Sequence, residues 1–276
     1  MKKQLTYLYS IALLFLTTAC EDVNFGNLFY SPCDVNARFE QSIAYNQARQ
    51  IDTLTVSDDA YSFWVTSDLH LKTELTTPIA NFLKSANDGS AQFIVYNGDI
   101  FHGKEEYADF ASNILHSQSP LPAFYVAGNH DLYFGWDVYH KRFGSSTYTA
   151  VVETPKGNDL LIFLESASAT LGQSQYNWLK EVFNQRYNYR HCFVFTHTNF
   201  YNQHITNGVF LSDEAHVLYH LFKEKKVTAV YSGHSHVEDQ EIILGVTYLT
   251  TGSLQNGKVA RVTVTEQTIE HEFKQF

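Results

Sequence analysis

The strongest constraint on the fold of this chain is a repeat in which a short apolar stretch ends in a polar motif. Residues 63–65 lead to Asp68-Leu69-His70, residues 92–96 to Gly98-Asp99, and residues 123–126 to Gly128-Asn129. Asp68 and Asp99 are 31 residues apart, and Asp99 and Asn129 are 30 apart, which is about the length of a strand–helix–strand unit. Because right-handed connections bring the ends of such strands to one edge of a parallel sheet, we expect these motifs to be neighbours in space.

The second half of the chain predicts the same alternation with antiparallel strands added. Residues 148–152 and 160–164 indicate a hairpin, and helices are expected near 173–185 and 213–223. Strands at 193–196 and 227–231 lead to His197 and to the motif Gly233-His234-Ser235-His236. Further strands are expected near 241–244, 246–250, 259–264 and 268–273, and a weaker helix signal covers 39–50. Strands that alternate with helices in this way are typical of an α/β fold.

Two of the motifs supply pairs of ligand side chains that are two residues apart, Asp68 with His70 and His234 with His236. In extended backbone, such pairs point to the same side, so each loop can deliver two ligands to one cavity. All the candidate ligands are oxygen or nitrogen donors, and none is a thiolate. This donor set suits Mn, Fe, Zn, Co or Ni, without selecting one of them.

The ordered set DxH, GD, GNHD, a single His and GHxH resembles the calcineurin-like metallophosphoesterase superfamily, over about residues 61–236. The resemblance implies a four-layer α/β/β/α sandwich of two mixed sheets flanked by helices. It also implies two divalent metal ions, and Asp99 would bridge them because its two oxygens can serve both. One ion would be held by Asp68, His70, Asp99 and His236, and the other by Asp99, Asn129, His197 and His234.

The implied reaction is hydrolysis of a phosphomonoester or phosphodiester by a metal-bridging hydroxide. His130 is expected to act on the transferring phosphoryl group or the leaving oxygen, and Asp131 to orient the His130 imidazole. Substrate contacts are expected from Asn129 and His130, and also from His102 and Tyr201. His102 stands where many members of the superfamily carry an Asp.

Two alternatives compete with this interpretation. Because the stretch from Gly98 to His102 is similar to that of the superfamily's DNA-break nucleases, a metal-dependent nuclease is the first. The second is a surface lipoprotein that keeps the fold as a binding module without catalysis. Such proteins usually lose metal ligands, whereas this chain lacks none of the expected set.

The charge of the chain argues against nucleic acid as a partner. The formal net charge is −10, and the single basic cluster is Lys223-Glu224-Lys225-Lys226. Nucleic-acid binders usually carry a basic stripe, because phosphate contacts supply most of their affinity. A phosphate ester would instead be attracted by the two dications, whose four positive charges exceed those of Asp68, Asp99 and a hydroxide.

The first 19 residues read as a signal peptide, with Lys2 and Lys3 before an apolar stretch from Leu5 to Leu16. Cys20 follows a small residue and is the expected site of lipidation. The protein would then be exported to the periplasm or surface of a bacterial cell and anchored to a membrane, and secretory cleavage after Ala19 is the alternative. Residues 20–57 would be an extension that packs on a domain spanning 58–276. A Cys33–Cys192 disulfide and the oligomeric state are left open.

Overall fold

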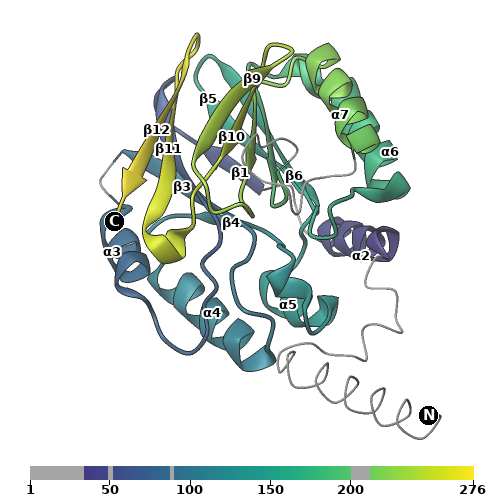
Figure 1. The fold of residues 1–276 in the computed structure, drawn as a ribbon. Coiled ribbons are helices and arrows are strands. Elements are labelled where there is room, and N and C mark those ends of the chain that lie inside the picture. The colour runs from purple at the N-terminus through teal and green to yellow at the C-terminus, as the bar shows by residue number, and fades with distance from the viewer. Residues whose placement is uncertain (1–33, 49–51, 88–89, 200–211) are drawn as a thin grey trace, which may run out of the picture.

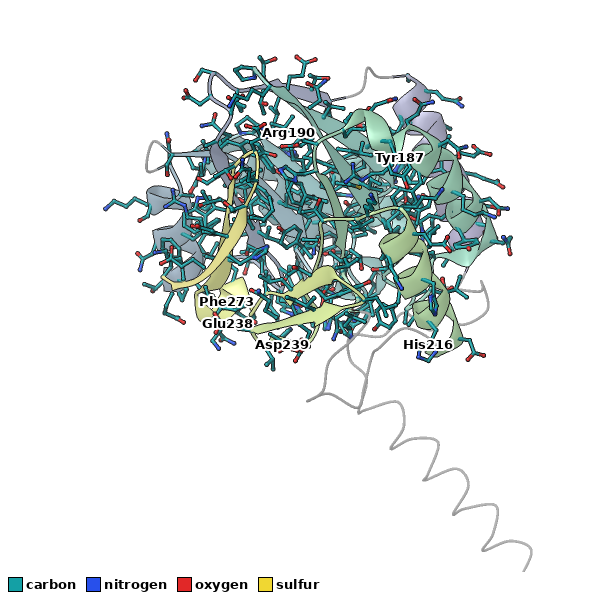
Figure 2. The ribbon with its side chains drawn as sticks, turned by 90° about the horizontal axis from the view of Figure 1, so that it is seen from above. Tyr187, Arg190, His216, Glu238, Asp239 and Phe273 are labelled. Atoms are coloured by element: carbon teal, nitrogen blue, oxygen red, sulfur yellow. The ribbon has the colours of Figure 1, made fainter. Side chains whose placement is uncertain are left out.

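The computed structural model describes residues 34–48, 52–87, 90–199 and 212–276. These residues form two β-sheets packed face to face, with helices on both outer faces (Figure 1). The predicted four-layer α/β/β/α sandwich is therefore confirmed. Seen from above, side chains fill the space between the two sheets (Figure 2). Among the helices of the described ranges, none is long and apolar enough to cross a membrane.

The larger sheet has seven strands in the order β1-β5-β6-β7-β8-β10-β9. Its neighbours are parallel except for two antiparallel pairs, β5 with β6 and β10 with β9. The strands are β1 (Asp52–Thr55), β5 (Tyr148–Thr154), β6 (Gly157–Leu164), β7 (Cys192–Thr196), β8 (Ala229–Ser232), β9 (Asp239–Ile243) and β10 (Val246–Thr250).

The smaller sheet has five strands in the order β12-β11-β2-β3-β4. Its strands are β2 (Tyr61–Thr66), β3 (Ala91–Asn97), β4 (Ala123–Val126), β11 (Lys258–Val264) and β12 (Ile269–Gln275). The three strands β2, β3 and β4 are parallel and adjacent, as the 30-residue repeat predicts. Their motif loops therefore leave the sheet at the same edge.

Helices α3 (Thr77–Ser85), α4 (Glu105–Gln118) and α5 (Trp136–Phe143) cover the five-stranded sheet, while α6 (Gly172–Val182) and α7 (Ser212–Glu224) cover the seven-stranded sheet (Figure 1). All six residues of β2 are buried, because the strand faces helices on one side and the other sheet on the opposite side. Phe63 points into the inter-sheet core, where its ring stacks on Phe93 at a centroid distance of 4.6 Å. Trp64 points to the helical side and packs against Phe82 of α3.

Two described pieces of the chain before residue 58, a helix and the strand β1, pack on the sandwich. Helix α2 (Val35–Gln47) begins at Asp34, whose side chain accepts a hydrogen bond from the Ala37 N–H at 2.9 Å. The helix packs against α6, and β1 pairs in parallel with β5, from Asp52 opposite Ala150. Residues 52–55 thus supply an edge strand of the larger sheet. The sequence gives little sign of this strand, because its side chains are mostly exposed and lack apolar alternation.

Candidate metal centre

Five loops converge at the carboxyl ends of strands from both sheets. Asp68 follows β2, Asp99 follows β3, Asn129 follows β4, His197 follows β7 and His234 follows β8. Backbone hydrogen bonds join these loops directly. The Asp68 N–H donates to the Gly98 carbonyl at 2.9 Å, and the Gly233 N–H donates to the His197 carbonyl at 2.8 Å. Main-chain bonds thus join the loops in two pairs, and side chains complete the assembly, since the His234 N–H donates to Asp68 Oδ2 at 2.9 Å.

The first group of candidate ligands contains Asp68, His70 and His236. The Nε2 atoms of His70 and His236 are 3.2 Å apart, and the His236 Nε2 lies 3.2 Å from Asp68 Oδ1. The distance from His70 Nε2 to the same oxygen is 3.9 Å. These three donors are the ones expected at one ion, together with Asp99.

The second group contains Asp99, His197 and His234, and Asn129 lies within it. The Asn129 Oδ1 is 3.0 Å from His197 Nε2 and 2.9 Å from His234 Nδ1. The two imidazole nitrogens are 3.3 Å from each other. These four residues are those expected at the other ion.

Asp99 lies between the two groups. Its Oδ1 is 3.4 Å from His197 Nε2 in the second group, and its Oδ2 is 3.9 Å from His70 Nε2 in the first. The His130 N–H donates to Oδ1 at 2.8 Å and fixes the carboxylate. One oxygen of Asp99 thus faces each group, which is the arrangement that a bridging ligand requires.

The chemistry of the donors fits a pair of cations. Asp68 Oδ1 is buried and accepts no hydrogen bond from the described residues, a state that is costly unless a cation or another donor compensates it. Lone pairs of several imidazoles and carboxylates also converge at short range, where like atoms repel one another in the absence of a positive charge. Divalent ions bound by oxygen and nitrogen ligands would satisfy both features.

The protonation states also suit metal binding. Burial lowers the pKa of His234 to about 4, so its imidazole is neutral at pH 7 and has a lone pair to offer. Burial opposes ionisation of Asp99, but the nearby His197, His130 and His70 outweigh it and lower the pKa of the carboxyl. Burial also works against the charged form of His197, yet the Asp99 carboxylate prevails and raises the imidazole pKa to about 9. His197 would therefore release a proton on binding a metal.

Five of the seven expected ligands have a backbone φ between 46° and 70°, a region that non-glycine residues rarely adopt. They are Asp68, His70, Asp99, His234 and His236. The sequence argument assumed extended backbone at the two ligand pairs, and this assumption is wrong. Left-handed conformations cost free energy and persist only where the surroundings impose them, which is common at functional sites.

Glycines at two motif positions allow this close approach. A Cβ atom at Gly98, where φ is +90°, would lie 2.4 Å from His197 Nδ1. A Cβ atom at Gly128 would lie 2.2 Å from the Asp99 Oδ1. Any larger residue at either position would displace a candidate ligand, so the glycines belong to the metal-binding motifs for steric reasons.

His130 is positioned differently from the sequence expectation. Its Nδ1 lies 3.1 Å from His102 Nδ1, and its Nε2 lies 3.0 Å from the Tyr133 hydroxyl. The two oxygens of Asp131 instead accept the backbone N–H groups of Phe101 and Gly128, at 3.0 and 2.8 Å. Asp131 therefore joins the second and third motif loops, and the expected contact with the His130 imidazole is made by His102 and Tyr133.

The structure also shows contacts that hold the His197 loop in place and that the sequence did not indicate. The Ser166 Oγ accepts the backbone N–H groups of His197 and Thr198, at 3.0 and 2.9 Å. Adjacent to it, Glu165 forms a buried ion pair with Arg38 of α2 at 2.9 Å. Glu165 and Arg38 do not belong to a recognisable motif, and 127 positions separate them in the sequence. Of the expected substrate contacts, His102 lies at the centre, whereas Tyr201 falls outside the described residues.

Similarity searches agree with this arrangement. The family model described as calcineurin-like phosphoesterase matches residues 61–238, and no curated protein gives a significant match. A dimetal phosphatase from Danio rerio is 13% identical, with a TM-score of 0.63 over 79% of this chain and 97% of that one. GAP50, the anchor in the inner membrane complex of Plasmodium, is 14% identical, with a TM-score of 0.63 over 79% and 85%.

A purple acid phosphatase from yellow lupin seeds is 12% identical and has a TM-score of 0.56, over 79% of this chain and 52% of that one. At such low identity, the likeness to solved structures shows a shared fold. The family model spans more than half of the chain and includes all five motif loops. The chain belongs to the calcineurin-like phosphoesterase family.

Proposed function

We propose that this protein is a dinuclear metal-dependent hydrolase of a phosphomonoester or phosphodiester. The observation that carries the proposal is the position of Asp99, with one oxygen toward each of two ligand groups. Membership of the family supports it. Two of the similar structures bear names that describe phosphatases, the dimetal enzyme of Danio rerio and the lupin enzyme.

The chain's own residues divide the work of the site. Asp68, His70 and His236 would hold one ion with Asp99, and Asn129, His197 and His234 would hold the other with the same carboxylate. Two bound dications would draw the phosphate ester to this acidic protein, offset charge on its phosphoryl oxygens and supply a hydroxide at neutral pH.

His130 would act on the substrate directly. Its imidazole is partly exposed and lies beside the first ligand group, with Nε2 at 3.9 Å from Asp99 Oδ2. His102 and Tyr133 hold both ring nitrogens, so the ring has a fixed orientation. A phosphoryl or leaving oxygen that replaced the Tyr133 hydroxyl at Nε2 would then receive a hydrogen bond or a proton from the ring.

The test combines metal content with hydrolysis. Protein incubated with Mn²⁺ or Zn²⁺ should bind two ions per chain and hydrolyse p-nitrophenyl phosphate or its bis-ester, and Asp99→Ala should lose both properties. Asp58→Ala, which removes the same charge from an exposed position, serves as the matched control. If neither ester is hydrolysed and Asp99→Ala binds as much metal as the parent protein, the proposal is wrong.

A nuclease is the second candidate, and the observation that favours it is the contact between His102 and His130. The histidine pair could place two nitrogens beside one phosphodiester. The net charge of −10 disfavours a long polyanionic substrate. Degradation of single-stranded DNA that depends on Asp99 would support the nuclease, and loss of His102 should then affect DNA cleavage more than cleavage of the bis-ester.

We also propose that the protein is exported and anchored to a bacterial membrane through a lipid on Cys20, as residues 1–20 indicate. Metabolic labelling with a radioactive fatty acid should mark the parent protein in the membrane fraction. A Cys20→Ser variant should carry no label and should leave that fraction. Equal labelling of both proteins would contradict the proposal.

A further inference from the structure

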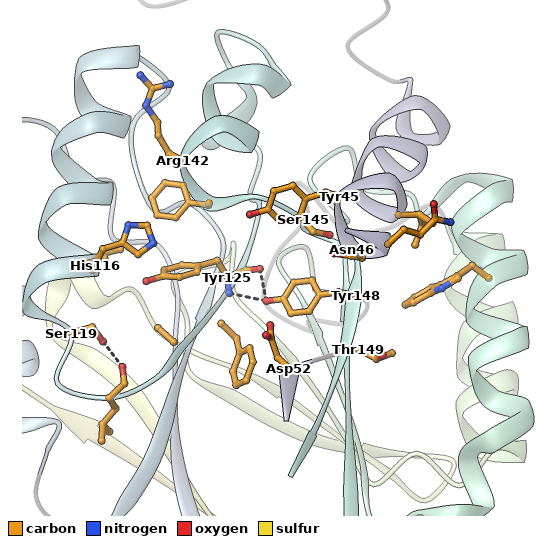
Figure 3. A pocket seen from close by; sticks show the side chains of 18 residues that line it. Tyr45, Asn46, Asp52, His116, Ser119, Tyr125, Arg142, Ser145, Tyr148 and Thr149 are labelled. Carbon is orange, nitrogen blue, oxygen red and sulfur yellow. Dashed lines mark hydrogen bonds between the residues drawn. The ribbon is translucent and has the colours of Figure 1, made fainter. Parts of the chain in front are cut away.

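A cavity of about 700 Å³ lies away from the metal centre, and none of the motif residues lines it. It is enclosed by α2, the end of α4, the end of α5 and the strands β1, β4 and β5 (Figure 3). Its volume is within the range of cavities that bind small molecules. Because β1 and β4 are the edge strands of the two sheets, the cavity occupies the open side of the sandwich.

Aromatic rings supply a third of the residues that line this cavity. Two of these residues, Tyr148 and Tyr125, are joined by a pair of hydrogen bonds. The Tyr148 hydroxyl donates to the Tyr125 carbonyl and accepts the Tyr125 N–H, both at 3.0 Å. Because both hydrogen bonds of the hydroxyl are made with the backbone of β4, Tyr148 contributes its aromatic ring to the lining of the cavity. The aromatic lining residues are Tyr45, Phe124, Tyr125, Phe143, Tyr148 and Trp178.

The charges around the cavity favour a positively charged occupant. Arg142 is bound by Asp109 at 2.7 Å and by Glu105 at 3.0 Å, and its guanidinium points away from the cavity (Figure 3). Its positive charge is thus already offset by two carboxylates. The Asp52 carboxylate is directed at the cavity and has no ion pair or hydrogen bond with the described part of the chain (Figure 3).

We propose that this cavity binds a small organic cation, an alkylated or quaternary ammonium compound. Such a cation is attracted by the faces of aromatic rings and needs no hydrogen-bond acceptor for each of its groups. The Asp52 carboxylate would supply the opposite charge. The remaining polar groups are engaged or neutral, since the His116 Nδ1 already contacts Ser112 Oγ at 3.0 Å. An anion would meet Asp52, and the one guanidinium among the described lining residues, that of Arg142, is already paired with two carboxylates.

Choline is the probe, and the readout is the intrinsic fluorescence of the three tryptophans, of which Trp178 lines the cavity, so the experiment is independent of catalysis. Titration with choline should change the fluorescence in a saturable manner. The neutral isostere 3,3-dimethyl-1-butanol has the same shape without the charge and should bind clearly more weakly. Isothermal titration calorimetry provides a second measurement that does not depend on tryptophan.

Two variants locate the site. Asp52→Asn should weaken choline binding about fivefold through loss of the ion contact, and Trp178→Leu should weaken it by a similar factor in calorimetry through loss of a ring. Asp58→Asn, an equal charge change at an exposed position away from the cavity, should bind choline like the parent. Circular dichroism shows whether each variant is folded.

The proposal is overturned if calorimetry detects no binding of choline at millimolar concentration. It is also overturned if the neutral isostere binds as tightly as choline, or if Asp52→Asn and Asp58→Asn have the same affinity as the parent. None of these outcomes bears on the metal centre, so failure here leaves the proposed hydrolase activity unaffected.

Discussion

The buried ion pair between Arg38 and Glu165 gives the sharpest test of how α2 supports the metal centre. The side chains are 7% and 2% exposed, and Arg38 Nε lies 2.9 Å from Glu165 Oε2. Arg38 also donates to Ser168 Oγ at 2.9 Å. Replacing Arg38 with Met preserves the apolar stem but removes the cation, so Glu165 becomes an unpaired buried charge.

Breaking a buried pair from one side typically costs about 3–5 kcal/mol of unfolding free energy. We expect the lower end, about 3 kcal/mol, because Glu165 still accepts the Ala167 N–H at 2.8 Å. That loss is a large part of the 5–15 kcal/mol by which domains are usually stable. Since Glu165 is adjacent to Ser166, which binds the His197 backbone, the affinity for metal should fall as well.

Urea unfolding followed by tryptophan fluorescence measures the change. Arg142→Met is the matched control, because the carboxylates of its two partners are 59–65% exposed, and such pairs contribute about 1 kcal/mol or less. The double variant Arg38→Met/Glu165→Leu removes both charges and should recover part of the stability. If Arg38→Met costs no more than Arg142→Met, α2 does not support the centre in this way.

Three further predictions concern single positions. Gly98→Ala should displace His197 and reduce metal binding at least tenfold by calorimetry, whereas Gly245→Ala, which has a similar φ of +84° but nothing within 4 Å, should leave metal binding unchanged. Asp131→Asn should lower stability in urea by about 1–3 kcal/mol, because an amide cannot accept both backbone N–H groups, and equal stability would contradict this role. Burial lowers the pKa of His271 to about 4, so the unfolded chain takes up the proton first as the pH falls. Stability should therefore decrease between about pH 6.5 and pH 4, by up to about 3 kcal/mol, and His271→Gln should show a weaker dependence on pH in the same assay.

The residues that the structure brings together at the candidate centre could be predicted from the sequence, because they follow a local pattern. The first three parallel strands and their motif loops repeat about every 30 residues, and three of the ligands, Asp99, Asn129 and His234, directly follow a glycine. The spacing of the strands and the order of the motifs can be read from neighbouring positions, without knowledge of contacts between distant residues. The expected hairpin and the tail strands were found for the same reason, with β5 and β6 on either side of a short turn.

The remaining features depend on contacts between distant positions. The pairing of Asp52–Thr55 with β5 and the bond from Tyr148 to Tyr125 involve residues with no shared pattern. The expectation that Asp131 orients the His130 imidazole rests on their adjacency in the sequence. In the 3₁₀ turn where they lie, neighbouring side chains diverge, and the buried carboxylate turns to the backbone N–H groups.

The backbone bonds among the motif loops bear on the order of folding and metal loading. Main-chain hydrogen bonds join the loop after β2 to the loop after β3, and the loop after β7 to the loop after β8. These bonds order the backbone of the loops without a metal ion, unlike a zinc finger, which folds only around its metal. If the proposed centre is loaded after folding, the ions bound there would reflect the supply in the compartment where loading takes place.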